Sequence, residues 1–149
     1  MDADQLASHC RKLENMYLGA PVNAYYKPEI RIGQGRADLV FPVRQDLYHA
    51  ANAVHGASYF KAVDDAAFFA ANSLVFDVFL LTASLTCYLV RPITEGEIRA
   101  AGCAVCETRS VILAETVLTD SDGNEIGRGS GSFVRSKIKL DSVPGYRLS

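Results

Sequence analysis

The sequence has no cluster of basic residues longer than the pair Arg11-Lys12. Its formal net charge is −2 at pH 7, with the histidines counted as neutral. A protein that binds nucleic acid needs a basic surface to neutralise the phosphates. The charge pattern therefore argues against nucleic acid as a partner.

The first residues and the cysteines of the sequence predict neither a secretory signal nor a disulfide framework. It starts with Met1-Asp2-Ala3-Asp4-Gln5, where a signal peptide would have a basic segment followed by an apolar one. Four cysteines, at positions 10, 87, 103 and 106, favour reduced thiols and a cytoplasmic location. Cys103 and Cys106 have a metal-like spacing, but residues three apart in a strand face opposite sides and no second pair follows. We therefore expect no metal site.

A long membrane-spanning run is absent as well. Residues 66–90 contain a single charged residue, Asp77. From Phe79 onwards, however, apolar residues alternate with a second set that includes Thr82, Ser84 and Thr86. A two-residue period with hydroxyls on one side is typical of a strand, so we expect no membrane partner.

What is present predicts one domain over residues 1–149, long enough to bury a core. Its N-terminal segment 1–20 contains a helix at 2–18, capped by Asp2 or Asp4 and ended by Gly19-Ala20-Pro21, with His9 expected on the surface. The apolar face of that helix carries Leu6, Cys10, Leu13 and Tyr17. The other predicted elements are a strand at 34–43, a loop at 44–54, an apolar helix at 57–74, strands at 79–90, 96–107, 109–119 and 125–136, and a loose tail at 141–149.

This order of elements favours an α+β fold. Four successive strands with short connections, one of them a tight Asp122-Gly123 turn, predict an antiparallel sheet. A helix that is apolar nearly all round is best buried by a sheet that curls around it. Gly127, Gly129 and Gly131 share one face of the last strand, where they allow the helix, a ligand or a partner to approach closely.

One carboxylate stands out in the apolar helix. Asp64 lies on a face whose other members are Ala57, Phe60, Phe68 and Ala71, so it either costs several kcal/mol or has a function. Burial there should raise its pKa towards the range of a general base. The adjacent Asp65 differs, because Lys61 four residues earlier can pair with it in solvent.

The segment His55-Gly56, followed eight residues later by Asp64 in a helix, resembles the active-site signature of hotdog-fold acyl-CoA thioesterases. The similarity is to the PaaI-like clade of the 4-hydroxybenzoyl-CoA thioesterase superfamily, and it covers about residues 35–136. It implies a hotdog fold, in which an antiparallel sheet wraps around a long central helix, and hydrolysis of an acyl-CoA thioester.

The resemblance also implies roles for single residues. Gly56 matches the glycine whose backbone N–H polarises the thioester carbonyl, which suits the free N–H groups of a helix N-terminus. His55 matches a histidine beside the carbonyl or the leaving thiolate. Asp64 matches the catalytic carboxylate, as general base or as nucleophile, and Thr82 matches a residue that positions the attacking water. Asp64 of one subunit would face the His55-Gly56 helix start of another.

Two positions depart from the family pattern. Ala57 replaces a second glycine, and His49 stands where an asparagine or glutamine often holds the carbonyl. His49, the nearby Asn52 or neither could take that role. The acyl and coenzyme A contacts are expected to include Ala57, Phe60, Phe68 and, for the phosphates, Arg91 at the end of a predicted strand.

No cofactor is expected, because coenzyme A is part of the substrate. The exposed edges of a curled sheet, together with the resemblance, imply a homodimer or a dimer of dimers. Two other functions stay open, a non-catalytic dimer that binds acyl thioesters and a hotdog dehydratase that acts on hydroxyacyl thioesters. A serine hydrolase is not expected, because Gly129-Ser130-Gly131-Ser132 lies in a strand and lacks the nucleophile-elbow spacing.

Overall fold

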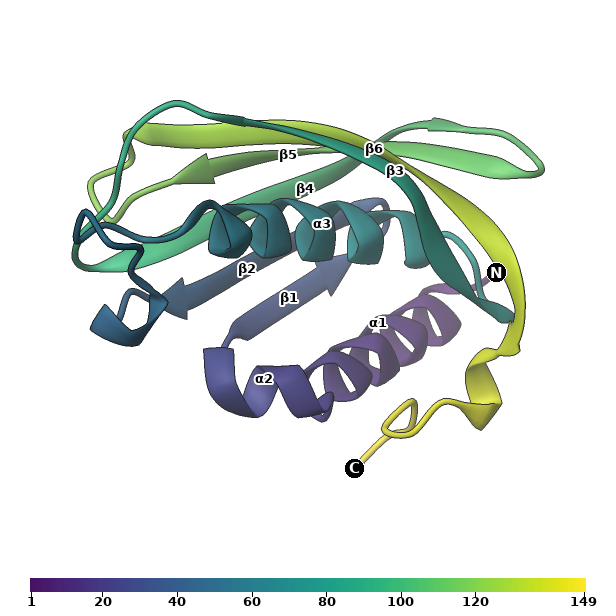
Figure 1. Cartoon of the computed structure of the whole chain (residues 1–149). Helices are drawn as coiled ribbons and strands as arrows, with labels where there is room; N and C mark the ends of the chain where they lie inside the picture. Colours follow the sequence, from purple (N-terminus) through teal and green to yellow (C-terminus); the bar gives the residue numbers. More distant parts are fainter.

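Six strands form one antiparallel sheet in the order β1-β2-β4-β5-β6-β3, and helix α3 lies along its inner face (Figure 1). The computed structural model describes residues 1–149. The helices are α1 (Ala3–Leu18), α2 (Pro21–Tyr26), α3 (Gly56–Asn72) and the short 3-10 helices η1 (Gln45–Leu47) and η2 (Leu140–Ser142). The strands are β1 (Glu29–Gly33), β2 (Arg36–Pro42), β3 (Val78–Leu89), β4 (Glu97–Glu107), β5 (Val111–Thr119) and β6 (Glu125–Lys139). The predicted sheet around a central helix is confirmed.

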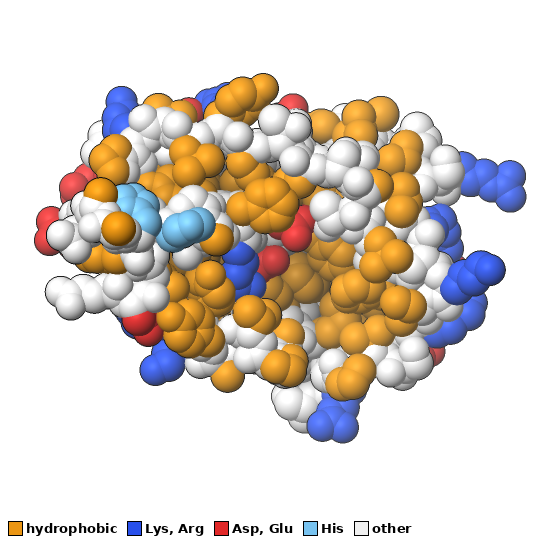
Figure 2. All heavy atoms as spheres, viewed as in Figure 1, with side chains coloured by type: hydrophobic (Ala, Val, Ile, Leu, Met, Phe, Trp, Pro, Cys, Tyr) orange, Lys and Arg blue, Asp and Glu red, His pale blue; other side chains and the backbone are white.

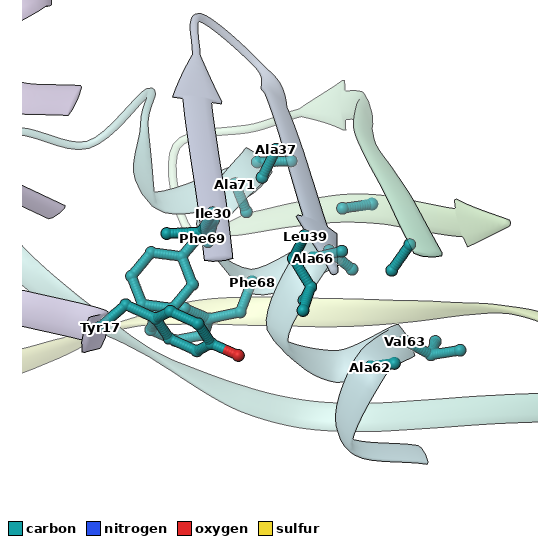
Figure 3. Close-up of a cluster of buried hydrophobic side chains, with 14 of the residues drawn as sticks. Tyr17, Ile30, Ala37, Leu39, Ala62, Val63, Ala66, Phe68, Phe69 and Ala71 are labelled. Atoms are coloured by element: carbon teal, nitrogen blue, oxygen red, sulfur yellow. The ribbon is translucent and has the colours of Figure 1, made fainter. Parts of the chain in front are cut away.

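Helix α3 contacts the sheet through its smallest side chains. Ala62, Ala66 and Ala70 have no exposed surface, and Figure 3 shows the first two with Val63 in the apolar cluster at this interface. At Gly102 of β4, an added Cβ atom would lie 2.2 Å from the carbonyl oxygen of Ala66. The helix backbone therefore rests directly on a glycine of the sheet, which allows close packing.

Gly129 of β6 makes a second close approach to α3. A Cβ atom there would lie 2.8 Å from Cγ1 of Val63 and 2.4 Å from the Thr86 carbonyl oxygen. The expectation that the glycine row of the last strand admits the helix is confirmed at this position.

Helix α1 begins as predicted but buries one residue that was expected at the surface. Asp2 caps it, with its side chain accepting from the Gln5 N–H at 2.7 Å. His9 is only 3% exposed. Its Nε2 lies 3.0 Å from the Asn72 carbonyl oxygen and its Nδ1 2.6 Å from the Tyr146 hydroxyl. The surface prediction for His9 was wrong, because segments distant in sequence cover that side of α1.

One α-helix and one strand were missing from the prediction, besides the two short 3-10 helices. The short helix α2 begins at Pro21, which was taken as a breaker but occupies the first turn of a new helix. Strand β1 pairs with β2 through a turn in which Gly35 has φ +68°. This edge strand is five residues long, and Ile30 and Ile32 alternate in it with exposed residues, so the sequence carried a short period-two signal that the prediction did not use.

The C-terminal segment 141–149, expected to be loose, makes specific contacts with α1. Asn15 donates from Nδ2 to the Arg147 carbonyl oxygen at 2.8 Å. A Cβ atom added at Gly145 would lie 3.1 Å from Cα of Met16, so the segment runs close against the helix. Figure 1 shows α1 beside β1, with this segment next to α1.

The helices give no sign of a membrane crossing: none of them combines the necessary length with sufficient apolar character. All four cysteines are free thiols.

Candidate active site

Asp64 of α3 and Thr82 of β3 are joined by a hydrogen bond. The Thr82 hydroxyl donates to Oδ1 of Asp64 at 2.8 Å. Asp64 lies in the middle of its helix, and Thr82 lies on the edge strand that runs beside it. The two residues that the resemblance linked to one reaction are therefore neighbours in the fold.

A bulge in β3 brings Thr82 to the helix. The register with β6 shifts between Thr82, which pairs with Phe133, and Ser84, which pairs with Ser132. Because directly paired residues share a face of a sheet, Thr82 faces inward with the fully buried Phe133, and Ser84 faces the other side. The predicted row of hydroxyls on a single face was wrong, since a bulge cannot be seen in a strict two-residue period.

The environment of Asp64 makes its carboxyl group a weaker acid than usual. Asp64 is half-buried, and burial raises its pKa above the ordinary value. The Thr82 hydrogen bond opposes this rise, the charge of Asp65 adds to it and the charge of Lys61 opposes it. A carboxylate with a raised pKa is suited to accept a proton near neutral pH.

The sequence suggested that Lys61 and Asp65 form an ion pair in solvent. In the structure this ion pair is largely covered. Lys61 Nζ lies 2.6 Å from Asp65 Oδ2, and their side chains are only 14% and 18% exposed. The Tyr17 hydroxyl of α1 donates to the same Asp65 oxygen at 2.6 Å. Helix α1, which has no detectable relation to this pair in the sequence, covers it.

Asp64, Asp65 and Lys61 line a pocket of about 470 Å³, called here the large pocket. Figure 2 shows a hollow on this face with hydrophobic side chains around it and acidic and basic side chains at its border. Its apolar wall comes from α1, α3, β3 and the C-terminal segment, and includes Met16, Phe68, Phe69, Phe79, Leu81 and Val143. Mostly apolar walls with a few polar groups are typical of a pocket for a small organic ligand.

The start of α3 is a second polar site. His55 is the N-cap residue, and its Nδ1 accepts a hydrogen bond from the Ala57 N–H at 2.9 Å. Gly56 is the first helical residue, so its N–H has no acceptor inside the helix. Such an N–H at the positive end of a helix can donate to a developing negative charge.

Beside Gly56 lies a smaller cavity of about 230 Å³. His49 and Arg91 both line it, which brings these two predicted site residues together with Gly56. His49 is exposed, and its Nδ1 accepts from the Ala51 N–H at 3.0 Å. The Arg91 guanidinium donates to the Glu125 carbonyl oxygen at 2.6 Å.

The other predicted contact residues lie apart from this cavity. Asn52 adopts a left-handed backbone with φ +63°, which asparagine tolerates better than most residues and which gives it a structural role in the turn. Ala57 and Phe60 are exposed, Phe60 by 47%. Phe68 is buried and lines the large pocket, and its contact with an acyl group stays a prediction.

Within one chain, the two halves of the candidate site are separate. Gly56 and Asp64 are eight residues apart in one helix, a rise of about 12 Å. They line different pockets. A single chain therefore does not bring its Asp64 to its own Gly56. No group of three His, Cys, Asp or Glu side chains is arranged to hold a metal ion.

Comparison with known proteins gives a family match. The model of the thioesterase superfamily matches residues 51–126, which run from the turn before α3 into β6. No match to a curated protein was found.

Solved structures share the fold over most of the chain. The PaaI protein of the phenylacetic acid degradation operon of E. coli superposes with a TM-score of 0.79 at 15% identity, covering 88% of this chain and 97% of its own. AziG of S. sahachiroi gives a TM-score of 0.74 at 20% identity, with coverage of 78% and 96%. A thioesterase of Haemophilus influenzae gives 0.74 at 11% identity, with coverage of 80% and 85%. The fold is the hotdog fold.

Proposed function

Because this chain belongs to the thioesterase superfamily, we propose that it hydrolyses acyl-CoA thioesters with Asp64 as the reacting acid. The observation that carries the proposal is a half-buried carboxylate, hydrogen-bonded to Thr82, at the border of a largely apolar pocket. The superfamily supports thioester hydrolysis in general. The acyl-CoA substrate and the role of Asp64 are our inference.

The reaction needs a base, an oxyanion donor and a leaving thiol. Asp64 removes a proton from water while the water oxygen bonds to the thioester carbonyl carbon. The carbonyl oxygen becomes an oxyanion and accepts a hydrogen bond from the Gly56 N–H. The carbon–sulfur bond then breaks, the carbonyl re-forms, and the thiolate takes up the proton held by Asp64. His55 would lie beside the leaving sulfur.

Thr82 suits this role of Asp64. Its hydroxyl occupies Oδ1, which leaves Oδ2 available to the attacking water. It also fixes the carboxylate in one orientation, which a general base requires. Direct attack by Asp64 on the carbonyl carbon is the other mechanism compatible with the same geometry.

A second copy of this chain would complete the site. β3 is an edge strand of twelve residues, and the side chains of Leu81, Tyr88 and Leu89 are exposed along it by 45%, 65% and 54%. A long apolar edge calls for a partner strand. Pairing of two β3 edges would form a homodimer, in which Asp64 of one subunit could meet Gly56 of the other.

The acyl group would enter the large pocket, and the coenzyme A would lie towards the cavity at Gly56. Phe68 and Phe79 supply apolar contact for the acyl chain. Arg91, which lines the smaller cavity, would contact a phosphate of the coenzyme.

A thiol-release assay over short, medium, long and aromatic CoA esters tests the function. We expect turnover of at least one ester, and a loss of kcat by a factor of about 10³ or more in Asp64→Asn. Asp122→Asn, an exposed turn residue, is the matched control and should keep wild-type activity. Binding of a non-hydrolysable acyl-CoA without thiol release from any ester would favour the non-catalytic alternative.

A further inference from the structure

Lys61 has two possible carboxylate partners on its own helix. Asp64 follows it by three residues and Asp65 by four, and both spacings place side chains next to each other on a helix. The structure pairs Lys61 with Asp65, at 2.6 Å. Helix geometry alone does not make this choice, so the cause lies in other elements.

Two tyrosines outside α3 favour the pairing with Asp65. The Tyr17 hydroxyl donates to the same Asp65 oxygen that accepts from Lys61. The Lys61 ammonium lies 5.4 Å from the centre of the Tyr17 ring and 5.0 Å from that of Tyr26, distances at which a cation is attracted to an aromatic face. Tyr17 belongs to α1 and Tyr26 to α2, both outside residues 51–126 that match the family model.

We propose that Asp65 is a positioning residue: together with Tyr17, it holds the Lys61 ammonium away from Asp64, so that the Asp64 carboxylate stays free to react. This inference rests on the proposed function, because it takes Asp64 as the reacting acid. It assigns a role to Asp65, Lys61 and Tyr17 that the hydrolysis itself does not require.

An ion pair between Lys61 and Asp64 would make Asp64 a poorer base. An ammonium bonded to Asp64 would stabilise the charged carboxylate, lower its pKa and make it a weaker proton acceptor. It would also occupy the oxygen that Thr82 leaves free. The titratable or hydrogen-bonding groups around Asp64 are Lys61 and Asp65 on α3, Thr82 and Cys87 on β3, and Tyr17 on α1. Among these groups, Lys61 is the cation.

The test compares Asp65→Asn in two backgrounds. The readout is the pKa of the Asp64 carboxyl, followed by ¹³C NMR of the intact protein and assigned with Asp64→Asn. Asp65→Asn removes a negative charge, which by itself lowers the pKa of Asp64. If Asp65 also restrains Lys61, the decrease should be larger by about one unit when Lys61 is present than in the Lys61→Gln background.

Equal decreases in both backgrounds would overturn the proposal, because Asp65 would then act through its own charge alone. Tyr17→Phe keeps every charge and should lower the pKa of Asp64 in the same direction by a smaller amount; no change would also count against the proposal. Asp122→Asn serves as the control for removal of a distant charge and should leave the pKa of Asp64 unchanged.

Activity measurements separate this inference from the proposed function. In an active enzyme, the acidic limb of the kcat/KM profile should move to lower pH in Asp65→Asn and move less in the Lys61→Gln background. A wild-type protein that releases no thiol would refute the proposed function. The NMR titration would still decide whether Asp65 keeps Lys61 off Asp64.

Discussion

The hydroxyl of Thr82, on the edge strand β3, donates a 2.8 Å hydrogen bond to Oδ1 of Asp64 in the central helix. This bond joins the sheet to the one half-buried acid that borders the large pocket without a basic partner. It depends on the bulge that follows Thr82, which separates this residue from the outward-facing hydroxyls further along the strand. Substitution of Thr82 or Asp64 therefore tests the proposed reaction.

Replacing Thr82 by valine should lower kcat about tenfold, because a hydrogen bond to a charged group contributes roughly 1.5–3 kcal/mol. The pKa of Asp64 should rise, since the bond favours the ionised form. The pH profile of kcat/KM measures both effects. Thr86→Val, an exposed position on the same strand, is the matched control. Equal kinetics in the two variants would show that the Thr82 contact is irrelevant to turnover.

Asp64, which the proposed reaction requires, should lower the stability of the folded protein at neutral pH. Its pKa is raised in the folded protein, chiefly by burial, so the folded state binds its proton more tightly than the unfolded state does. Its contribution to the free energy of unfolding is therefore largest at low pH and declines as the pH rises through and above 3.8. Asp64→Asn should consequently be inactive but melt at a higher temperature than the wild type at pH 7, and a lower Tm would contradict this account of its burial.

A shared active site predicts complementation between two inactive variants. Gly56→Pro removes the N–H at the first helical position, where proline is tolerated, and His55 before it has a compatible extended backbone with ψ 142°. Unfolding and refolding Gly56→Pro together with Asp64→Asn gives mixed dimers with one intact site. Thiol release should recover to about a quarter of the wild-type value. If mass spectrometry verifies mixed dimers but no thiol release is recovered, Gly56 and Asp64 would have to act in a site within one chain.

The contact of α3 with the sheet predicts a large difference between two glycine substitutions. Gly102→Ala introduces a Cβ atom 2.2 Å from the Ala66 carbonyl oxygen, and Gly33→Ala introduces one with nothing within 4 Å. The first should lower the free energy of unfolding by about 3 kcal/mol or more, because neither backbone can move without disturbing the core. Gly33→Ala should be near neutral. Urea denaturation of both variants provides the measurement.

His9 should make the fold sensitive to mild acid. Burial lowers its pKa below the ordinary value of 6.5, because it disfavours the charged imidazolium, and the charge of Lys12 acts in the same direction, while the hydrogen bond to the Asn72 carbonyl opposes the decrease. The unfolded chain therefore takes up a proton before the folded one, and stability is lost as the pH falls below about 6.5. His9→Gln should be less stable at pH 7 but lose less stability between pH 7 and 5. Parallel pH slopes for the two proteins would exclude His9 as the sensor.

The hydrophobic periods of the sequence determined most of the fold. The apolar stretch that became α3, the alternation in the strands that follow it and the Asp122-Gly123 turn were sufficient to predict a sheet around a helix. These signals are local: each depends on residues within one helical turn or one hairpin. Asp64 could be singled out in the same way, from the apolar helix face on which it lies, whereas His55-Gly56 was singled out by the resemblance to a known family.

Only the tertiary structure decided which groups surround Asp64. The bulge that turns Thr82 inward, the burial of Lys61 and Asp65 by Tyr17, and the approach of the C-terminal segment to α1 all involve residues far apart in sequence. Their positions follow from how the sheet curves and what covers the open side of α3, which no local period encodes. The sequence thus supplied the candidate carboxylate, and long-range packing supplied neighbours that affect its charge.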